Sequence, residues 1–203
     1  MASEKGILLV VSGPSGSGKG TVIGRLMELR EDFVYSVSAT TRTPRDGEKN
    51  GVNYWFLTKD EFERRIDGGM MLEWAEYCGN YYGTPKKEVI DSLENGKNVI
   101  LEIEVQGALQ VRKKFPEAVL LMITPPDFRT LESRLRGRGD KVPEEVILKR
   151  LDTAKSELAH IGEYDYLVIN DEIDKAASQI IGVVDSEKCR VSRRAEVVSG
   201  FFA

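Results

Sequence analysis

Residues 7–21 read Ile-Leu-Leu-Val-Val-Ser-Gly-Pro-Ser-Gly-Ser-Gly-Lys-Gly-Thr, an apolar run followed at once by a glycine-rich turn. The apolar residues 7–11 predict a fully buried strand, and the pattern of residues 18–29 predicts an amphipathic helix. The predicted inner face of that helix carries Val22, Ile23, Leu26 and Leu29. The turn between the two elements has the spacing G-x-x-x-x-G-K, which in this context predicts a phosphate-binding loop.

The predicted loop consists of Gly13, Pro14, Ser15, Gly16, Ser17, Gly18, Lys19, Gly20 and Thr21. Its glycines let backbone N–H groups converge on one anion, and the N-terminus of the helix adds partial positive charge. The alternative is a glycine-rich turn without a ligand. Gly20 stands where most such loops place a hydroxyl on Mg²⁺, so we expect nucleotide phosphates and water to hold the metal.

Further apolar runs predict buried strands at residues 99–103, 119–123 and 166–169, with helical patterns between them. Alternation of this kind favours a parallel sheet covered on both faces, with ligands at the carboxyl ends of its strands. Two stretches interrupt the alternation. Residues 38–84 hold short strand-like pieces and a helix opened by a capping box, Thr58 with Glu61, and residues 127–160 are helical and rich in arginine.

Composition excludes several classes of protein. The 203 residues are 41% hydrophobic and 31% charged, which excludes a disordered, collagen-like or membrane-embedded chain. A net charge of −4 gives no sign of a nucleic-acid or membrane partner. Two cysteines, Cys78 and Cys189, and a single histidine, His160, argue against a disulfide framework, a zinc site and a Ser-His-Asp hydrolase. We expect a cytoplasmic protein.

A second anion site is suggested by residues 38–48, which read Ser-Ala-Thr-Thr-Arg-Thr-Pro-Arg-Asp-Gly-Glu. Arg42 and Arg45 flank a proline and make a plausible clamp for phosphate, because guanidinium groups bind phosphate bidentately. Tyr54, Tyr81 and Tyr82 can donate phenolic hydroxyls to the same anion. The alternative is a solvated polar loop with paired surface charges.

The chain resembles guanylate kinase over residues 7–184, through residues 13–21 and 38–48, Gly-Asn-Tyr-Tyr-Gly-Thr-Pro at 79–85, Leu-Glu-Ile-Glu-Val-Gln-Gly at 101–107, Arg-Gly-Arg-Gly at 136–139 and Val-Ile-Asn-Asp at 168–171. The resemblance implies the α/β fold of a P-loop nucleoside monophosphate kinase. It implies a parallel-sheet core (1–37, 85–126 and 156–203), a small mixed α/β GMP-binding lobe (38–84) and a helical lid (127–155). The implied reaction is transfer of the γ-phosphoryl group of ATP, as Mg·ATP, to GMP or dGMP.

By resemblance, the residues that would hold the GMP phosphate are Ser38, Arg42, Arg45, Tyr54 and Tyr82. Glu73 and Thr84 would read guanine, and Glu104 either joins them or touches water near the metal, since the family more often has Asp there. Guanine presents N1–H and an amino group to one carboxylate, and its O6 accepts from a hydroxyl, whereas adenine offers Glu73 a lone pair. From the residues alone, Thr84 could instead cap the next helix, and Glu73 could be a strand-edge charge.

The resemblance also implies the groups that act on the transferring phosphoryl group: Lys19, Arg42, Arg134, Arg138 and Arg150. They would stabilise charge on its equatorial oxygens. Asn170 matches a position near the ATP adenine, or else lies in the N-terminal region of the next helix. No side chain is predicted to bind the metal directly, although Glu102 could do so through water. The stretch 139–145 is one residue longer than the family pattern.

Two other functions compete with this interpretation. A monophosphate kinase for another base is opposed by Glu73. A related scaffold domain that binds phosphopeptides without catalysis is opposed by the intact phosphate loop. The oligomeric state stays open, and residues 186–203 fit either a terminal helix or a subunit contact.

Overall fold

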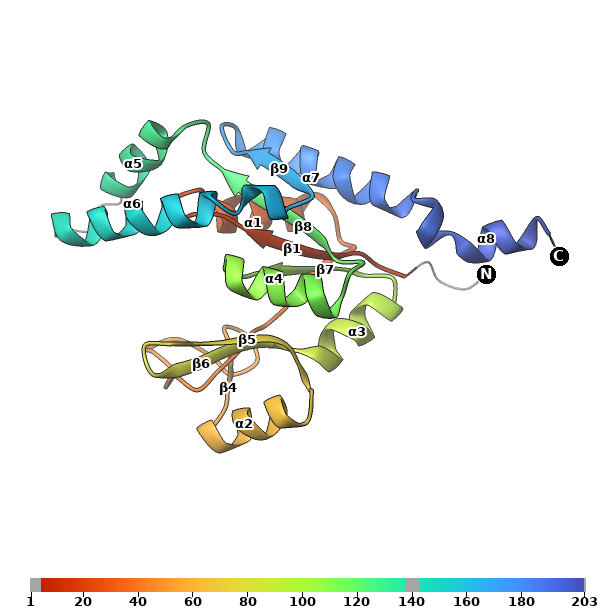
Figure 1. Ribbon diagram of the computed structural model, residues 1–203, viewed down its shortest axis with the longest axis horizontal. Coiled ribbons are helices and arrows are strands. Elements are labelled where there is room, and N and C mark those ends of the chain that lie inside the picture. Colours follow the sequence, from red (N-terminus) through yellow and green to blue (C-terminus); the bar gives the residue numbers. More distant parts are fainter. Residues whose placement is uncertain (1–4, 138–142, 203) are drawn as a thin grey trace.

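The computed structural model describes residues 5–137 and 143–202, so the predicted site residue Arg138 and the insertion near it lie outside the described residues. The chain forms a five-stranded parallel sheet and a separate four-stranded mixed sheet (Figure 1). The large sheet has the order β2-β7-β1-β8-β9. Its strands are β1 (Leu8–Ser12), β2 (Phe33–Tyr35), β7 (Asn98–Glu102), β8 (Val119–Thr124) and β9 (Tyr166–Ile169). The predicted parallel sheet is therefore confirmed, and the ends of the four predicted strands agree with the structure to within one residue.

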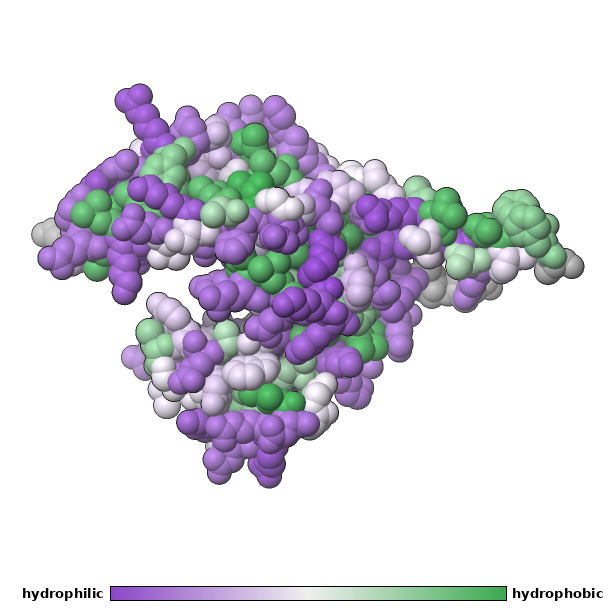
Figure 2. All heavy atoms as spheres, in the orientation of Figure 1, coloured by the Kyte–Doolittle hydropathy of each residue, from purple (hydrophilic) through white to green (hydrophobic). Residues whose placement is uncertain are grey.

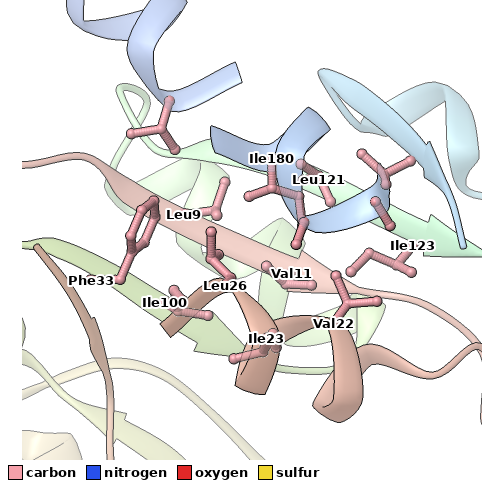
Figure 3. Packing of buried hydrophobic residues seen from close by; sticks show 14 of the residues in the cluster. Leu9, Val11, Val22, Ile23, Leu26, Phe33, Ile100, Leu121, Ile123 and Ile180 are labelled. Atoms are coloured by element: carbon pink, nitrogen blue, oxygen red, sulfur yellow. The ribbon is translucent and has the colours of Figure 1, made fainter. Parts of the chain in front are cut away.

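Helices cover both faces of the large sheet because alternate side chains of each strand point to opposite faces. On one face, Leu9 and Val11 of β1 pack in a cluster with residues of α1 (Lys19–Leu29) and α7 (Ile173–Lys188), as Figure 3 shows. On the other face, a second cluster includes residues of α3 (Lys86–Glu94) and α4 (Val105–Lys114). The prediction for Leu29 is wrong: it ends α1 and is 42% exposed.

The small sheet has the order β4-β3-β6-β5 and places β5 at its edge. Its strands are β3 (Ala39–Thr40), β4 (Trp55–Phe56), β5 (Met71–Tyr77) and β6 (Asn80–Pro85). One helix, α2 (Lys59–Asp67), packs on it and buries Phe62. The predicted N-cap is confirmed, because Thr58 Oγ1 accepts a hydrogen bond of 3.2 Å from the backbone N–H of Glu61.

The arginine-rich stretch forms two helices, α5 (Phe128–Arg136) and α6 (Glu144–Leu158), as its helical pattern predicts. They share a small apolar cluster that includes Leu131 and Leu151. Arg136 joins the two helices through ion pairs with Glu132 of α5 and Glu144 of α6. A 3-10 turn, η1 (Ile161–Glu163), then leads into β9.

The C-terminal segment runs beyond the sheet as a 3-10 turn, η2 (Val191–Arg193), and a short helix, α8 (Ala195–Gly200). Glu187, whose side chain is 2% exposed, anchors it through ion pairs with Arg190 and Arg193. Apolar side chains at its end are exposed, and Figure 2 shows them at the tip of the molecule. Within residues 5–137 and 143–202, no helix combines the length and apolar character needed to cross a membrane.

Candidate active site

The phosphate loop lies where the sequence places it, between the end of β1 and the start of α1. Gly18 is the N-cap of α1 and adopts the left-handed conformation, with φ 84°, which a residue with a side chain rarely adopts. The Nζ of Lys19 donates to the carbonyl of Gly13 at 2.5 Å, so the lysine is folded over the loop that it would share with a nucleotide. The loop thus gathers N–H groups and one ammonium at the carboxyl edge of the sheet.

Asn170 holds this loop through a hydrogen bond to its backbone. Its Nδ2 donates to the carbonyl of Ser17 at 2.8 Å, and the residue is only 4% exposed. A Cβ at Gly18 would lie 2.4 Å from the same Nδ2, so Gly18 is needed both for its backbone conformation and for the approach of Asn170. The helix that follows begins at Ile173 with Glu172 as its N-cap, and no side chain caps it. Asn170 therefore serves the loop and not the helix.

A cavity of about 920 Å³ lies in front of the loop. Figure 2 shows the molecule hollowed between the part built on the large sheet and the part built on the small one, with hydrophilic side chains around the opening. The sequence-predicted residues that line this cavity are Gly13, Ser15, Gly16, Gly18, Lys19, Gly20, Thr21, Tyr54, Glu102, Glu104 and Arg150. Pro14 and Ser17 are buried within the loop and do not line it.

Helix α6 contributes one side of this cavity. The residues that face it, at helical spacing, are Val146, Lys149, Arg150, Thr153 and Glu157. Of these residues the sequence predicts only Arg150; Val146 and Thr153 lie four and three positions from it on the same helical face, and Glu157 lies four beyond Thr153. Burial raises the pKa of Glu157 above its ordinary value, while the charge of Lys19 opposes that rise. The cavity therefore holds a carboxylate opposite the loop lysine that the sequence motifs do not reveal.

A second cavity, of about 360 Å³, opens between the small sheet and the start of α4. The predicted residues that line it are Ser38, Tyr54, Glu73, Tyr82, Glu102 and Glu104. Tyr54, Glu102 and Glu104 line both cavities, so the two are contiguous. The lining residues that the sequence does not predict are Ala75, Tyr77, Gly83, Ile103, Gln106 and Gly107. Small and apolar residues in the wall of a pocket carry no chemical signature, and nothing in the sequence sets Tyr77 and Gln106 apart from other polar residues.

Glu73 is the buried carboxylate of this second cavity. It is 5% exposed, and the hydroxyl of Thr84, itself 1% exposed, donates to its Oε1 at 2.7 Å. Burial raises the pKa of Glu73 above its ordinary value, and the hydrogen bond from Thr84 opposes that rise. Helix α3 has Pro85 as its N-cap without a side-chain bond. Thr84 therefore partners Glu73 instead of capping a helix, and Glu73 is not a solvated strand-edge charge.

Arg42 lies against Tyr54, which lines both cavities, but neither Arg42 nor Arg45 lines a cavity itself. The Nη2 of Arg42 donates to both carboxylate oxygens of Glu48 at 2.9 and 3.0 Å, and the guanidinium carbon lies 5.5 Å from the ring centre of Tyr54. The pKa of Glu48 is lowered, mainly by its hydrogen bond from Arg42. Arg45 differs from it: its side chain is exposed, and its backbone N–H donates to Glu48. The carboxylate of Glu48 thus binds both the side chain of Arg42 and the backbone of Arg45.

Arg134 does not line the cavities. Its Nη2 donates to the backbone carbonyl of Asn170 at 3.0 Å, which joins α5 to the segment that supports the phosphate loop.

A metal would find few direct ligands here: among the described residues, no group of three or more His, Cys, Asp or Glu side chains can hold one. Mg²⁺ is usually bound by one or two carboxylates together with substrate phosphates and water, and Glu102 at the cavity wall fits that pattern.

The parallel sheet with a phosphate loop at its carboxyl edge, facing a second pocket with a buried carboxylate, defines a P-loop phosphotransferase of the nucleoside monophosphate kinase class. Residues 5–187 match the family model described as guanylate kinase. Guanylate kinase from Desulfitobacterium hafniense (strain Y51) is 48% identical over 98% of this chain and 100% of its own length. Guanylate kinase from Lactococcus lactis subsp. lactis (strain IL1403) is 52% identical over 94% of this chain and 92% of its own.

A crystal structure of guanylate kinase from Anaplasma phagocytophilum shares the fold with a TM-score of 0.73 and 34% identity, covering 95% of this chain and 92% of that one. The chain therefore belongs to the guanylate kinase family. The predicted fold class is confirmed, and so is the predicted enzyme class, an ATP-dependent kinase that phosphorylates GMP.

Proposed function

We propose that this chain phosphorylates both GMP and dGMP with Mg·ATP in the cytoplasm, as a step of purine nucleotide metabolism, without a nucleic-acid or membrane partner. The two contiguous cavities carry this proposal: one contains the phosphate loop and the other contains Glu73. A phosphoryl group passes between two nucleotides only if both bind at once with their phosphates adjacent, and the shared wall at Tyr54, Glu102 and Glu104 provides that adjacency.

In the first cavity, backbone N–H groups of residues 13–21 and the ammonium of Lys19 bind the ATP phosphates. Asn170 acts on ATP through the loop that it supports. Mg²⁺, when bound, would supply positive charge that offsets the charge of the ATP phosphates, and Glu102 would hold it through water. Arg150 on α6, with Arg134 and Arg138, stabilises charge on the phosphoryl group during transfer, so electrostatics and positioning supply the catalysis.

In the second cavity, the hydroxyls of Ser38, Tyr54 and Tyr82 bind the GMP phosphate, and Arg42 and Arg45 reach it from beside the cavity when the lobe closes. Glu73 accepts hydrogen bonds from N1–H and the 2-amino group of guanine, and Thr84 turns its hydroxyl from Glu73 to O6. Glu104, exposed at the junction of the cavities, contacts the base edge or the water around the metal. Adenine has an acceptor at N1, so the buried carboxylate of Glu73 would face a lone pair without a hydrogen bond. In a low-dielectric site such an unpaired charge costs much free energy.

The chain divides functionally into a core (1–37, 85–126 and 156–203), a GMP lobe (38–84) and a lid (127–155). Water must be excluded from the γ-phosphoryl group to prevent hydrolysis, so the lobe and the lid close over the substrates. Calorimetry tests the two-site arrangement. GMP titrated into protein saturated with a non-hydrolysable Mg·ATP analogue should still bind with one equivalent, whereas competition between the two ligands would refute separate sites.

A further inference from the structure

Helix α4 holds the edge strand of the small sheet one residue away from Glu73. The Oε1 of Gln110 accepts from the backbone N–H of Trp74 at 3.3 Å, and its Nε2 donates to the carbonyl of the same residue at 2.9 Å. These are the two bonds that a neighbouring strand would make to an edge residue. Because α4 begins directly after β7, this contact couples β5 of the small sheet to the large sheet (Figure 1).

Gly107, three residues before Gln110, faces the same side of α4. A Cβ at this position would lie 2.9 Å from Oε2 of Glu73 and 3.3 Å from Cδ1 of Ile103. The first distance is shorter than van der Waals contact, so any side chain here would push the carboxylate away. In the protein without GMP, the other carboxylate oxygen accepts from Thr84, so Glu73 cannot shift there without giving up that hydrogen bond.

The strand itself is shaped to present Glu73. The pairing register between β5 and β6 shifts between Met71 and Glu73, so Leu72 is an extra residue on β5. Leu72 packs into the core of the large sheet while Met71 packs into that of the small sheet. Bulges of this kind re-aim neighbouring side chains. The bulge at Leu72, the two hydrogen bonds of Gln110 to Trp74 and the absence of a side chain at Gly107 together orient the carboxylate of Glu73 toward the second cavity.

We propose that Gly107 and Gln110 are positioning residues for base specificity, which fix the carboxylate of Glu73 against guanine by leaving room for Oε2 and by clamping Trp74. This inference rests on the proposed role of Glu73. Guanine offers two parallel donors to one carboxylate, so a small rotation of that carboxylate costs one of the two hydrogen bonds. IMP lacks the 2-amino group and loses less from the same rotation.

The test compares Gly107→Ala and Gln110→Met with a control, Gly182→Ala, in steady-state assays with GMP and with IMP at saturating Mg·ATP. Gly182 lies in α7, and a Cβ there would meet no atom within 4 Å. We expect both α4 variants to raise KM for GMP about tenfold and to leave kcat within about twofold. The GMP-to-IMP ratio of kcat/KM should fall severalfold, by less than KM for GMP rises, because IMP also loses some affinity. Gly182→Ala should match the parent enzyme.

A merely structural role would lower activity with GMP and IMP together and leave their ratio unchanged, and that outcome in both α4 variants would overturn the inference. Glu73→Gln is measured in parallel. If Glu73→Gln also keeps the parental ratio, the proposed reader of guanine is wrong. If the GMP-to-IMP ratio of kcat/KM falls in Glu73→Gln but stays at the parental value in Gly107→Ala and Gln110→Met, the proposed function stands and the positioning inference alone fails.

Discussion

The side-chain amide of Asn170 donates to the carbonyl of Ser17 over 2.8 Å, and the backbone carbonyl of Asn170 in turn accepts a bond from Arg134. These two bonds connect α5, the residue after β9, and the phosphate loop. Asn170 is buried and does not line the cavity, so the loop is held by a residue that is itself outside the cavity wall. The position of α5, which carries Arg134, therefore depends on the order of the phosphate loop.

Replacing Asn170 by Ala should weaken ATP binding. The substitution leaves the buried carbonyl of Ser17 without this donor, which costs about 1–3 kcal/mol and loosens the loop that binds phosphate. We expect the Kd for Mg·ATP to rise about tenfold in calorimetry while GMP binding stays unchanged. Asn95→Ala is the control, because the amide of Asn95 donates to Asp91 on the exposed end of α3. Equal ATP affinity in both variants would contradict the supporting role of Asn170.

Glu73→Gln should make the protein more stable at neutral pH. Burial raises the folded-state pKa of Glu73 above its value of about 4.3 in the unfolded chain, so folding is penalised once this carboxyl must ionise. The penalty is absent below the unfolded pKa and develops as pH rises through the folded pKa. Thermal unfolding from pH 4 to pH 8 should therefore show a higher Tm for Glu73→Gln at pH 7, with a difference that shrinks toward pH 4.

The same titration should appear in the kinetics of the parent enzyme. Protonated Glu73 cannot accept from both donors of guanine, so KM for GMP should rise as pH falls through the folded pKa of Glu73. A KM for GMP that stays constant over this range, together with an unchanged Tm for Glu73→Gln, would show that the carboxyl does not ionise in the site.

Arg42→Ala should weaken GMP binding about tenfold to a hundredfold, because a bidentate guanidinium contact to phosphate is lost. The ion pair with Glu48 is bidentate and its side chains are only 15% and 18% exposed, so Tm should also fall, and binding is measured well below it. Arg25→Ala is the matched control, since Arg25 pairs with Glu28 and Asp174 on an exposed face. Calorimetry with GMP separates the variants, and unchanged affinity in Arg42→Ala would remove Arg42 from the GMP site.

Asp32→Asn should destabilise the protein at pH 7 and less so in acid. Hydrogen bonds from Arg30 lower the pKa of Asp32 to about 2. A lowered folded-state pKa gives stability that is present above the unfolded value and is lost as pH falls toward 2. Because the Asp32 side chain is 31% exposed, we expect a loss of about 1 kcal/mol in the free energy of unfolding by urea. A loss of equal size at pH 7 and pH 2.5 would contradict this origin.

Much of the fold follows from local pattern. The apolar runs that become β1, β7, β8 and β9 are long enough to stand out, and the glycine spacing of residues 13–18 places the phosphate loop. By contrast, β2 and β3 have only three and two residues, and they exist because neighbouring strands pair with them. No local pattern carries that information. Leu29 was misplaced because the end of α1 extends past the sheet that buries its earlier turns.

The candidate site shows the same division. The spacing of the glycine-rich motif predicts Lys19, and the arginine pair around Pro44 suggests Arg42, whereas Glu73 is expected only through the resemblance to guanylate kinase. Gly107 and Gln110 are not visible as site residues, since their roles arise from the approach of α4 to β5, which are far apart in the sequence. The resemblance predicts Asn170 near the adenine of ATP. Its contact with Ser17 joins two segments far apart in the sequence, and it depends on the place of β9 at the edge of the sheet.

The central claim is that the buried carboxylate of Glu73 selects guanine for phosphorylation. The most direct measurement is ADP formation from Mg·ATP with GMP, dGMP, AMP, CMP or UMP as acceptor, using the parent enzyme and Glu73→Gln. We predict turnover by the parent with GMP and dGMP only, and loss of kcat/KM for both in the variant. Comparable turnover with AMP or UMP, or a variant that phosphorylates GMP as well as the parent does, would contradict the claim.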